Sequence, residues 1–289
     1  ENVETKFLKN KLKDCDAISL RTTKFTKELI ESAPKLKIIS RHGVGFDNID
    51  LDEVKKKKIT VSITADSLAP TVAEHVFFMM LNISRGTDLY DKSVKEGNFS
   101  NRKNLPLSKE LSNKNILIIG FGRIGKNLIK KCISFDMKVF VHDPYVDEKT
   151  ISNYQGKKIS NLQEIIKEMD YVSVHVPLTE KTKNLINKKI LSSMKKSSII
   201  INTSRGGVVN EIDLNDALKN DLIFGAGLDV FEKEPPDANN PLLKNKKVFL
   251  SPHSSTFTEE CSERMGKEAI QNIIDFFQNK LNKTKIINI

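Results

Sequence analysis

The chain has 289 residues, of which 38% are hydrophobic and 29% are charged. This length can bury a full core and hold two domains of ordinary size, and the composition is typical of a globular protein. No run of about 18 apolar residues occurs, which excludes a membrane span. The N-terminus is polar and charged, so we expect no signal peptide in the chain.

The net charge of +10 raises nucleic acid as a possible partner. The lysines, however, occur as scattered pairs and as one run at residues 55–58, and acids are interleaved with them. They form no stripe with aromatic side chains on which bases could stack. We therefore interpret the charge as a solvated face that can also steer an anionic substrate, and we expect no nucleic-acid partner.

The three cysteines, Cys15, Cys132 and Cys261, are odd in number and far apart in the chain. This pattern indicates a reducing compartment and no disulfide framework, and no spacing fits a metal site. We expect a cytoplasmic protein without a metal.

The first 66 residues alternate between short helical and extended patterns. Helices are predicted at residues 3–12, 26–32 (with Thr26 as N-cap) and 50–57, and strands at residues 17–20, 36–40 and 59–63. Such alternation predicts a parallel sheet with right-handed crossovers. The chain begins at a helix, so we expect that the usual opening strand of such a unit is missing.

Two contrasting segments follow. Residues 71–85 are apolar on nearly all sides, which predicts a helix buried between layers or domains. Residues 86–113 are polar and contain Gly86, Gly97 and Pro106, which predicts an irregular arm or linker.

A glycine pattern at residues 120–125 is the feature around which the rest of the chain is organised. The apolar run at 116–119 predicts a strand buried on both faces, and Gly120, Gly122 and Gly125 follow with the spacing G-x-G-x-x-G. Gly120 permits a sharp turn, Gly122 lets the backbone approach a pyrophosphate, and Gly125 lets helix and strand pack closely. The helix that starts there directs free N–H groups and its positive dipole end at the phosphates.

A second apolar strand at residues 138–143 ends in Asp143. A carboxylate at this position accepts hydrogen bonds from the adenosine ribose hydroxyls and repels the extra phosphate of NADP, which favours NAD. Alternatively, Asp143 is only a turn residue before Pro144. The strand context together with the glycine pattern predicts a dinucleotide site.

The same rhythm continues to the end of the chain. Further strands are predicted at residues 171–176, 198–203, 225–230 and 248–251, with helices at 161–167, 187–193 and 211–220, giving about six strands in all. Residues 258–279 predict a long amphipathic helix that packs back on the first unit. We therefore expect a discontinuous substrate-binding domain, residues 1–66 and 257–289, and a dinucleotide-binding domain, residues 67–256.

Three polar clusters follow predicted strand ends, where open α/β sheets bind ligands. They place Arg205, Glu234 and His253 near one another. Hydride transfer to a carbonyl needs a proton donor of near-neutral pKa, which histidine supplies, and a neighbouring carboxylate raises that pKa and orients the ring. An arginine can polarise the carbonyl and bind a carboxylate bidentately.

Each of these residues also has an ordinary structural interpretation. His253 could be a buried histidine bonded to a backbone group, Glu234 a surface acid and Arg205 a structural ion-pair former. Their joint occurrence at three strand ends favours the catalytic interpretation. The weaker candidates are the other four histidines, His42, His75, His142 and His175. His75 lies on the apolar helix and is interpreted as a core residue.

These motifs together make the sequence resemble the D-isomer-specific 2-hydroxyacid dehydrogenases. The resemblance covers essentially the whole length of the chain, apart from an N-terminal βαβ segment of the family. The matching pieces are residues 43–50, 72–75, 120–125, 175–179, 202–207, 227–235 and 251–253. The resemblance implies a Rossmann-type doubly wound parallel sheet plus a smaller flavodoxin-like α/β substrate domain.

The resemblance also implies roles for individual residues. His253 would be the acid/base, Glu234 its partner and Arg205 a substrate ligand, while backbone N–H groups near Val44 and Gly45 would hold the substrate carboxylate. Cofactor contacts, with NAD as the cofactor, would fall on Gly120, Gly122, Arg123, Ile124, Gly125, Asp143, Val176, Pro177, Thr203, Ser204, Asp229 and Ser255.

Within the family, the segments around Arg21 and Arg41 look similar to those from which phosphoglycerate dehydrogenases present arginines to the substrate phosphate. The segment 95–102, with Arg102, also has that subfamily's shape, although Phe99 replaces its usual tryptophan. Three arginines that bind one phosphate dianion would be physically reasonable, because each guanidinium can donate two hydrogen bonds to phosphate oxygens. Alternatively, Arg21 and Arg41 are ordinary strand-end residues.

The prediction is thus an NAD-dependent oxidoreductase for a D-2-hydroxy acid, with 3-phosphoglycerate, as in serine biosynthesis, as the first substrate candidate. Hydroxypyruvate, glyoxylate and sulfolactate remain alternatives, and an NAD-responsive corepressor is the alternative of a different class. The resemblance implies a homodimer formed through the nucleotide domain and residues 86–113.

Overall fold

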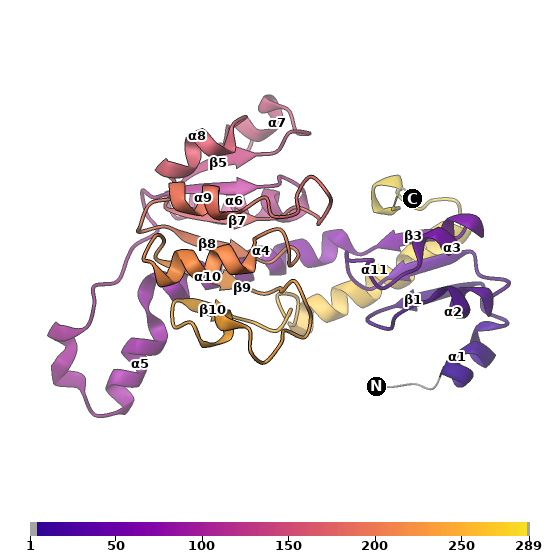
Figure 1. The fold of residues 1–289 in the computed structure, drawn as a ribbon. Coiled ribbons are helices and arrows are strands. Elements are labelled where there is room, and N and C mark those ends of the chain that lie inside the picture. Colours follow the sequence, from indigo (N-terminus) through magenta and orange to yellow (C-terminus); the bar gives the residue numbers. More distant parts are fainter. Residues whose placement is uncertain (1–4, 288–289) are drawn as a thin grey trace. The chain divides into compact units, whose positions relative to one another are not determined.

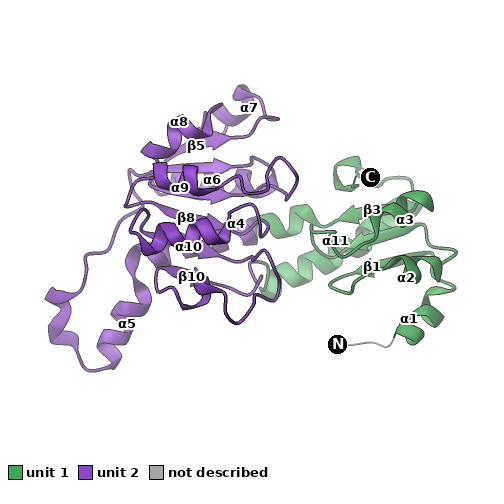
Figure 2. Cartoon of the chain, in the orientation of Figure 1, with its two compact units in different colours: residues 1–69, 256–289 green, residues 70–255 purple. Residues whose placement is uncertain are grey.

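A computed structural model describes residues 5–287, and the chain divides into two compact units (Figure 2). Unit 1 consists of Glu1–Ala69 and Thr256–Ile289, and unit 2 of Pro70–Ser255. Within the described residues, no helix has the length and apolar character that crossing a membrane requires. Residues 3 and 4 of the first predicted helix lie outside the described residues.

Unit 1 is built on a three-stranded parallel sheet in the order β1-β2-β3. Its strands are β1 (Ala17–Leu20), β2 (Ile38–Arg41) and β3 (Thr60–Ile63), and its first three helices are α1 (Thr5–Leu12), α2 (Lys27–Glu31) and α3 (Leu51–Lys56). Asp50 caps α3 by accepting the Glu53 N–H at 3.1 Å. Thr26 stands at the N-cap of α2 as predicted, but its side chain makes no capping bond.

The C-terminal helix α11 (Glu259–Phe277) packs against β2 in the same unit. The side chain of Thr258 accepts the Cys261 N–H at 3.1 Å and so begins the helix. Met265 and Ala269 are buried on one stripe of α11, as a helix that covers a sheet requires.

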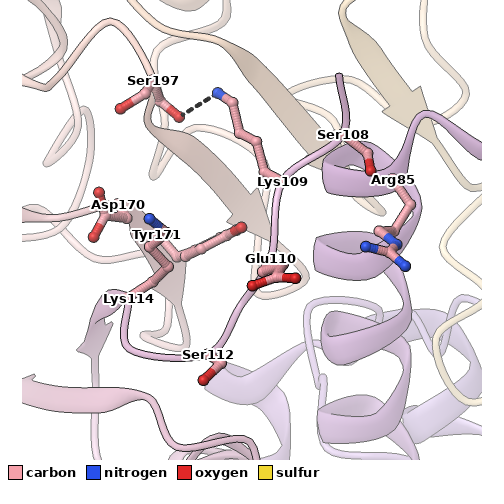
Figure 3. A pocket seen from close by; sticks show the side chains of 9 residues that line it. All are labelled: Arg85, Ser108, Lys109, Glu110, Ser112, Lys114, Asp170, Tyr171 and Ser197. Atoms are coloured by element: carbon pink, nitrogen blue, oxygen red, sulfur yellow. Dashed lines mark hydrogen bonds between the residues drawn. The ribbon is translucent and has the colours of Figure 1, made fainter. Parts of the chain in front are cut away.

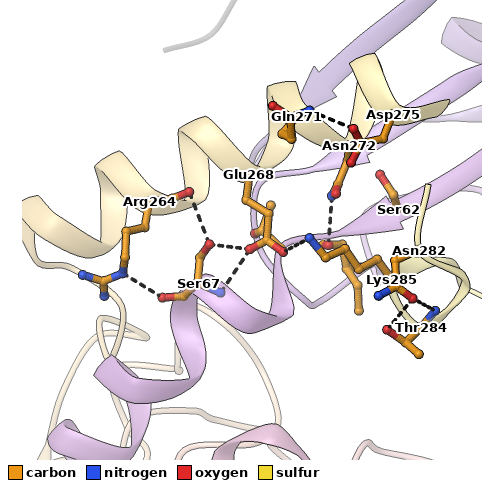
Figure 4. A network of polar contacts seen from close by, with 12 residues as sticks. Ser62, Ser67, Arg264, Glu268, Gln271, Asn272, Asp275, Asn282, Thr284 and Lys285 are labelled. Atoms are coloured by element: carbon orange, nitrogen blue, oxygen red, sulfur yellow. Dashed lines mark hydrogen bonds and ion pairs between the residues drawn. The ribbon is translucent and has the colours of Figure 1, made fainter. Parts of the chain in front are cut away.

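A polar network around Glu268 joins three segments of unit 1 (Figure 4). One carboxylate oxygen of Glu268 on α11 accepts a hydrogen bond from the backbone N–H of Ser67 at 3.0 Å. The same oxygen accepts a second hydrogen bond from the Ser67 hydroxyl. Its other carboxylate oxygen pairs with Lys285 at 2.8 Å, and Arg264 donates to the Ser67 carbonyl at 3.3 Å. The Glu268 side chain is only 9% exposed, so these contacts compensate the desolvation of its charge.

Unit 2 contains a seven-stranded parallel sheet in the order β10-β9-β8-β7-β4-β5-β6. The strands are β4 (Asn115–Ile119), β5 (Lys138–His142), β6 (Lys157–Lys158), β7 (Tyr171–Val174), β8 (Ile199–Asn202), β9 (Gly225–Leu228) and β10 (Val248–Leu250). The chain reverses its direction across the sheet between β4 and β7, which is the switch point where such sheets bind ligands. The short β6 was not predicted, because two lysines carry no apolar pattern.

Helices cover both faces of this sheet, which makes it doubly wound (Figure 1). One apolar cluster includes residues of α4 (Ala65–Arg85), α6 (Arg123–Ser134) and α7 (Glu148–Ser152). The other includes residues of α8 (Leu162–Ile165), α9 (Lys188–Ser193) and α10 (Glu211–Lys219), together with η2 (Ile166–Glu168). Two further short helices are η3 (Pro241–Lys244) in unit 2 and η4 (Lys283–Lys285) in unit 1.

Helix α4 begins at Ala65, six residues before the predicted start, so that boundary was wrong. Pro70 lies inside this helix, although proline removes one intrahelical hydrogen bond and crowds the carbonyl four residues before it. Here that lost bond belongs to the first turns of the helix, and the contacts of Ser67 with Glu268 stabilise the same turn.

The prediction of an irregular arm at residues 86–113 was also wrong, because this segment contains helix α5 (Thr87–Lys95) and η1 (Phe99–Asn104). Gly86 adopts φ +60°, ends α4 and starts α5. The apolar side chains Leu89, Val94 and Phe99 are exposed on this arm. We refer below to residues 86–107 as the arm.

The Glu268 network predicts a large difference between two glutamates of one helix. Glu268→Ala leaves Lys285 and the Ser67 N–H without their acceptor, and we expect it to lower the free energy of unfolding by about 3 kcal/mol. Glu263→Ala is the matched control, because its partner Lys267 is exposed on the same helix. Urea titration followed by circular dichroism measures both; equal midpoints for the two variants would contradict the role given to Glu268.

Candidate active site

The carboxyl ends of three neighbouring strands bring the predicted catalytic residues to one edge of the unit 2 sheet. Leu228 at the end of β9 pairs with Asn202 of β8 and with Leu250 of β10. Arg205 and His253 each follow their strands by three residues, and Asp229 follows β9 directly. Because the strands are parallel, these positions meet at the same edge.

His253 and Glu234 form a direct pair. Nδ1 of His253 lies 2.7 Å from Oε2 of Glu234, and the other carboxylate oxygen accepts the Phe231 N–H at 3.1 Å. The second bond fixes the carboxylate, which in turn orients the imidazole. The His253 side chain is 50% exposed, so Nε2 is left free to face a ligand.

The backbone around His253 is held by the carboxylate and carbonyl of Asp229, which is fully buried. The Asp229 carbonyl accepts the His253 N–H at 2.9 Å. Its two carboxylate oxygens accept the N–H groups of Ser254 at 2.8 Å and Ser255 at 3.0 Å. The hydroxyl of Ser251 donates to the same carboxylate at 2.5 Å. The three hydrogen bonds to the carboxylate therefore compensate the burial of its charge.

Arg205 follows β8 in a turn that Asn202 organises. The Asn202 side chain donates to the Arg205 carbonyl at 2.9 Å and accepts from the hydroxyl and N–H of Ser204 at 2.7 and 3.0 Å. One Nη of Arg205 donates to the Ser204 carbonyl at 2.7 Å. The hydroxyl of Thr203 is buried and has no hydrogen-bond partner among residues 5–287. A buried orphan hydroxyl of this kind is suited to a ligand.

The three glycines differ in the space around them. A Cβ atom on Gly120 would lie 2.5 Å from the His175 carbonyl oxygen, and one on Gly125 would lie 2.5 Å from the Gly120 carbonyl oxygen. A Cβ on Gly122, the N-cap of α6, would meet no atom within 4 Å. Gly120 and Gly125 therefore permit close packing, while the space beside Gly122 fits a pyrophosphate at the start of α6.

Asp143 at the tip of β5 is tied to the glycine loop. Its carboxylate oxygens accept the N–H groups of Phe121 and Tyr145, each at 2.8 Å. Since Phe121 lies between the first two glycines, this bond joins the ribose-binding position to the phosphate-binding loop. The fixed carboxylate suits the predicted contact with the adenosine ribose.

The remaining predicted cofactor contacts lie along the same edge. Val176 and Pro177 follow β7, and a Val176 methyl group is close to the Gly120 position. Burial lowers the pKa of the preceding His175 to about 3, so this ring is neutral at pH 7. The predicted contacts Arg123 and Ile124 lie in the first turn of α6. The residues present thus fit a dinucleotide.

Unit 1 carries the predicted substrate residues at the corresponding ends of its own strands. Arg21 follows β1, Arg41 ends β2, and Gly43 adopts φ +141° with its N–H bonded to the Thr64 hydroxyl at 2.8 Å. The next two N–H groups, those of Val44 and Gly45, have no hydrogen-bond partner within the described part of the chain. Two consecutive free donors suit a carboxylate.

The two arginines of unit 1 differ in their surroundings. Arg21 is exposed, and its charge, second to burial, lowers the pKa of His42. Arg41 is half-buried, and its Nη1 donates to the carbonyls of His42 at 2.8 Å and Leu20 at 3.3 Å. Arg41 therefore supports the local backbone, whereas Arg21 is an exposed residue.

Arg102 lies on η1 of the arm. The opposite edge of the unit 2 sheet, where strands begin, carries a polar pocket of about 500 Å³ beside the arm (Figure 3). Its lining includes Arg85 at the end of α4 and Lys114, which precedes β4. The pocket is therefore separate from the candidate site at the carboxyl edge.

Comparison with known proteins identifies the family. Residues 77–255 match the model of the D-isomer specific 2-hydroxyacid dehydrogenase NAD-binding domain. The chain belongs to this family. It is an NAD-dependent dehydrogenase that acts on the CH–OH group of a D-2-hydroxy acid, as the resemblance predicted.

Several relatives of this dehydrogenase share more than a third of its sequence. It is 36% identical to a glyoxylate reductase of Korarchaeum cryptofilum, across 96% of this chain and 84% of that protein. It is 37% identical to a hydroxypyruvate reductase of Thermotoga maritima, across 94% and 88%. It is 36% identical to a D-3-phosphoglycerate dehydrogenase of Methanocaldococcus jannaschii, but spans only 52% of that protein.

Solved structures agree with the fold. The D-lactate dehydrogenase of Aquifex aeolicus, solved with NAD and lactic acid, is 33% identical to this dehydrogenase. The TM-score is 0.84, and the match covers 96% of this chain and 88% of that one. The predicted Rossmann-type fold and the NAD cofactor are thereby confirmed.

Two residues of the site network were missed by sequence reasoning. Ser251 was noted only as part of a polar cluster, and His75 only as a core residue of α4. The structure places Nε2 of His75 3.0 Å from the Ser251 hydroxyl. A histidine within an apolar helix indicates a buried polar partner, but sequence gives no means of naming it. Among the described residues, no cluster of three or more His, Cys, Asp or Glu side chains could hold a metal ion.

The glycine environments predict that two alanine substitutions affect different properties, one the affinity for NADH and the other the stability of the fold. Gly122→Ala meets free space in the protein, so we expect it to fold normally but to weaken NADH binding by about tenfold or more, because the methyl group occupies the pyrophosphate position. Gly125→Ala pushes a methyl group against the Gly120 carbonyl, and we expect a loss of about 1–3 kcal/mol in stability.

Fluorescence titration with NADH and thermal unfolding measure these two effects separately. Each variant is the control for the other, since the substitutions are chemically identical and three residues apart. A Gly122→Ala protein with unchanged NADH affinity would remove the phosphate-binding role from this loop.

Proposed function

We propose that the dehydrogenase interconverts a D-2-hydroxy acid and its 2-keto acid with His253 as the proton donor and acceptor. The contact that carries this proposal is the 2.7 Å pair between His253 Nδ1 and Glu234. Bound NAD would exchange a hydride with the C2 carbon of the substrate, and a proton must then be delivered to, or removed from, the C2 oxygen. The half-exposed imidazole of His253 can do this through Nε2, because its other ring nitrogen is bonded to Glu234.

Glu234 stabilises the imidazolium that forms when His253 takes a proton from the hydroxyl group. Because the Phe231 N–H holds one carboxylate oxygen, the other remains directed at Nδ1. The pair therefore fixes which ring nitrogen faces the substrate.

Substrate binding is proposed to use one cation and two backbone donors. Arg205 would polarise the C2 carbonyl and bind the neighbouring carboxylate. The free N–H groups of Val44 and Gly45 would hold the same carboxylate from unit 1.

The first substrate candidate is the 3-phosphoglycerate and 3-phosphohydroxypyruvate pair, which would place the enzyme in serine biosynthesis. Arg21 is exposed and directly follows β1. Strand β1 pairs with β2, and β2 leads to the Gly43–Gly45 loop. A phosphate on the third carbon of a substrate held at that loop would find a cation there. The D-3-phosphoglycerate dehydrogenases among the relatives are consistent with this choice.

The second candidate is an unphosphorylated keto acid, glyoxylate or hydroxypyruvate. Arg41 favours it, because one of its nitrogens is already bonded to two backbone carbonyls, which leaves less of the guanidinium for a phosphate. Relatives named glyoxylate reductase and hydroxypyruvate reductase match the chain equally well.

We also propose a homodimer formed through unit 2 and the arm. Three apolar arm residues, Leu89, Val94 and Phe99, are between 46% and 64% exposed, and contact with a second copy would bury them. Arg102 lies in η1 of the same arm. In a dimer it would serve the partner's substrate rather than that of its own chain.

The free thiols suit a cytoplasmic location.

A substrate panel tests the choice between these candidates. NADH oxidation is followed with phosphohydroxypyruvate, hydroxypyruvate, glyoxylate, pyruvate and sulfopyruvate as alternative substrates. If the phosphate is recognised, Arg21→Gln raises KM for phosphohydroxypyruvate by about tenfold or more and leaves KM for hydroxypyruvate unchanged. Lys24→Gln, on the same exposed loop, is the matched control. Preference for an unphosphorylated substrate, insensitive to Arg21, would establish the second candidate.

The catalytic proposal predicts a separation of turnover from cofactor binding. His253→Gln keeps a side chain of similar size but removes the proton donor, so kcat should fall by about 100- to 10,000-fold. NADH affinity should stay near that of the native enzyme, because His253 is proposed to face the substrate. Steady-state kinetics and NADH titration measure the two quantities, and unchanged turnover would remove His253 from the mechanism.

A further inference from the structure

A buried chain of hydrogen bonds runs from helix α4 to the backbone that carries His253. It begins at His75, whose Nε2 lies 3.0 Å from the Ser251 hydroxyl oxygen. Ser251 donates to Oδ1 of Asp229 at 2.5 Å. The carbonyl and carboxylate of Asp229 then accept three consecutive backbone N–H groups, those of residues 253–255. Every link in this chain lies within unit 2.

The direction of each hydrogen bond follows from what each group can donate. The Asp229 carboxylate only accepts, so the Ser251 hydroxyl must donate its proton to it. The Ser251 oxygen is then an acceptor, and Nε2 of His75 must carry a proton. Burial lowers the pKa of His75, with the charge of Asp229 acting in the opposite direction, so the ring is neutral at pH 7. His75 is therefore the neutral tautomer with its proton on Nε2.

This chain bears on catalysis because the backbone of His253 needs external support. His253 adopts φ +51°, in the left-handed region that side chains other than glycine disfavour. Its N–H is held by the carbonyls of Asp229 at 2.9 Å and Ser251 at 3.1 Å. The side chain itself is half exposed, and among the described residues its one polar contact is with Glu234. Its position thus depends on the backbone below it.

We propose that His75 is a positioning residue for His253 and acts through Ser251 and Asp229. This inference rests on the proposed role of His253 as the proton donor. The His75 N–H occupies the acceptor site on the Ser251 oxygen and so keeps the hydroxyl proton directed at Asp229. Without that N–H, the buried Ser251 oxygen lacks a donor, its hydroxyl can rotate away, and the Asp229 carboxylate loses one of its bonds. A small displacement of His253 is sufficient to slow proton transfer.

Three variants separate this role from simple packing of the His75 ring. His75→Leu removes the N–H and retains most of the side-chain volume. His75→Gln is the conservative variant, because its amide nitrogen can reach the position of Nε2. Phe78→Leu is the packing control: its ring lies 5.9 Å from that of His75 on the same helix, but it has no part in the polar chain.

We expect His75→Leu to lower kcat by about tenfold to a hundredfold while the dissociation constant of NADH changes by less than about threefold. His75→Gln should recover most of the lost kcat, and Phe78→Leu should retain the native kcat. Thermal unfolding of each variant verifies that it folds. A Gln variant as slow as the Leu variant, or a Leu variant that loses only NADH affinity, would overturn the proposal.

Ser251 provides a second test, because its hydroxyl is hydrogen-bonded to both His75 and Asp229. If the two side chains act in one chain, His75→Leu in a Ser251→Ala background should lower kcat by less than about threefold further. Effects that multiply fully would show that His75 acts by another route, and the proposal would be wrong.

Nitrogen-15 NMR of the histidine rings tests the geometry without any turnover. The spectrum should show His75, assigned by its loss in His75→Gln, as a neutral ring with the proton on Nε2, and Ser251→Ala should shift both this signal and that of His253. A His75 proton on Nδ1 would refute the chain of hydrogen bonds. If the native protein shows these signals but reduces none of the keto acids in the panel, the proposed function fails and the hydrogen-bond chain stands.

Discussion

The parallel alignment of the unit 2 strands is the constraint on which the site depends. Because all seven strands run in one direction, residues that are far apart in the chain leave the sheet at the same edge. The glycine loop follows β4, Asp143 follows β5, Val176 follows β7, and the catalytic positions follow β8 to β10. The apolar side chains that pack α4 and α6 on one face, and α9 and α10 on the other, hold that alignment. The chemistry is therefore placed by the packing of residues that never touch a ligand.

Much of this arrangement follows from local sequence alone. Strand β4 is an uninterrupted apolar run, the glycines that follow it have separate steric functions, and polar clusters come directly after later strands. These are short-range signals, and the predicted positions of β4, β7, β8 and α10 agree with the structure within a few residues. The pairing of His253 with Glu234, nineteen positions earlier in the chain, also follows once the strand order is assumed.

What sequence could not supply depends on contacts between distant segments. Pro70 is a helix barrier in local terms, yet α4 continues through it, with Glu268 bonded to the first turn from a helix some two hundred residues later. The arm has a polar composition typical of a linker, but its helix α5 forms after the left-handed Gly86. The hydrogen bond between His75 and Ser251 joins a helix to a loop 176 residues away, and no local sequence pattern predicts it.

The left-handed backbone of His253 places two demands on one position. The fold would be relaxed by glycine or asparagine there, because either tolerates a positive φ more readily than an imidazole-bearing residue. The reaction, however, requires the imidazole. Selection for activity therefore holds this position away from its stability optimum, and the surrounding loop must supply the compensation. It follows that variants selected only for thermal resistance will tend to lose function at this loop first, although the rest of the sheet remains intact.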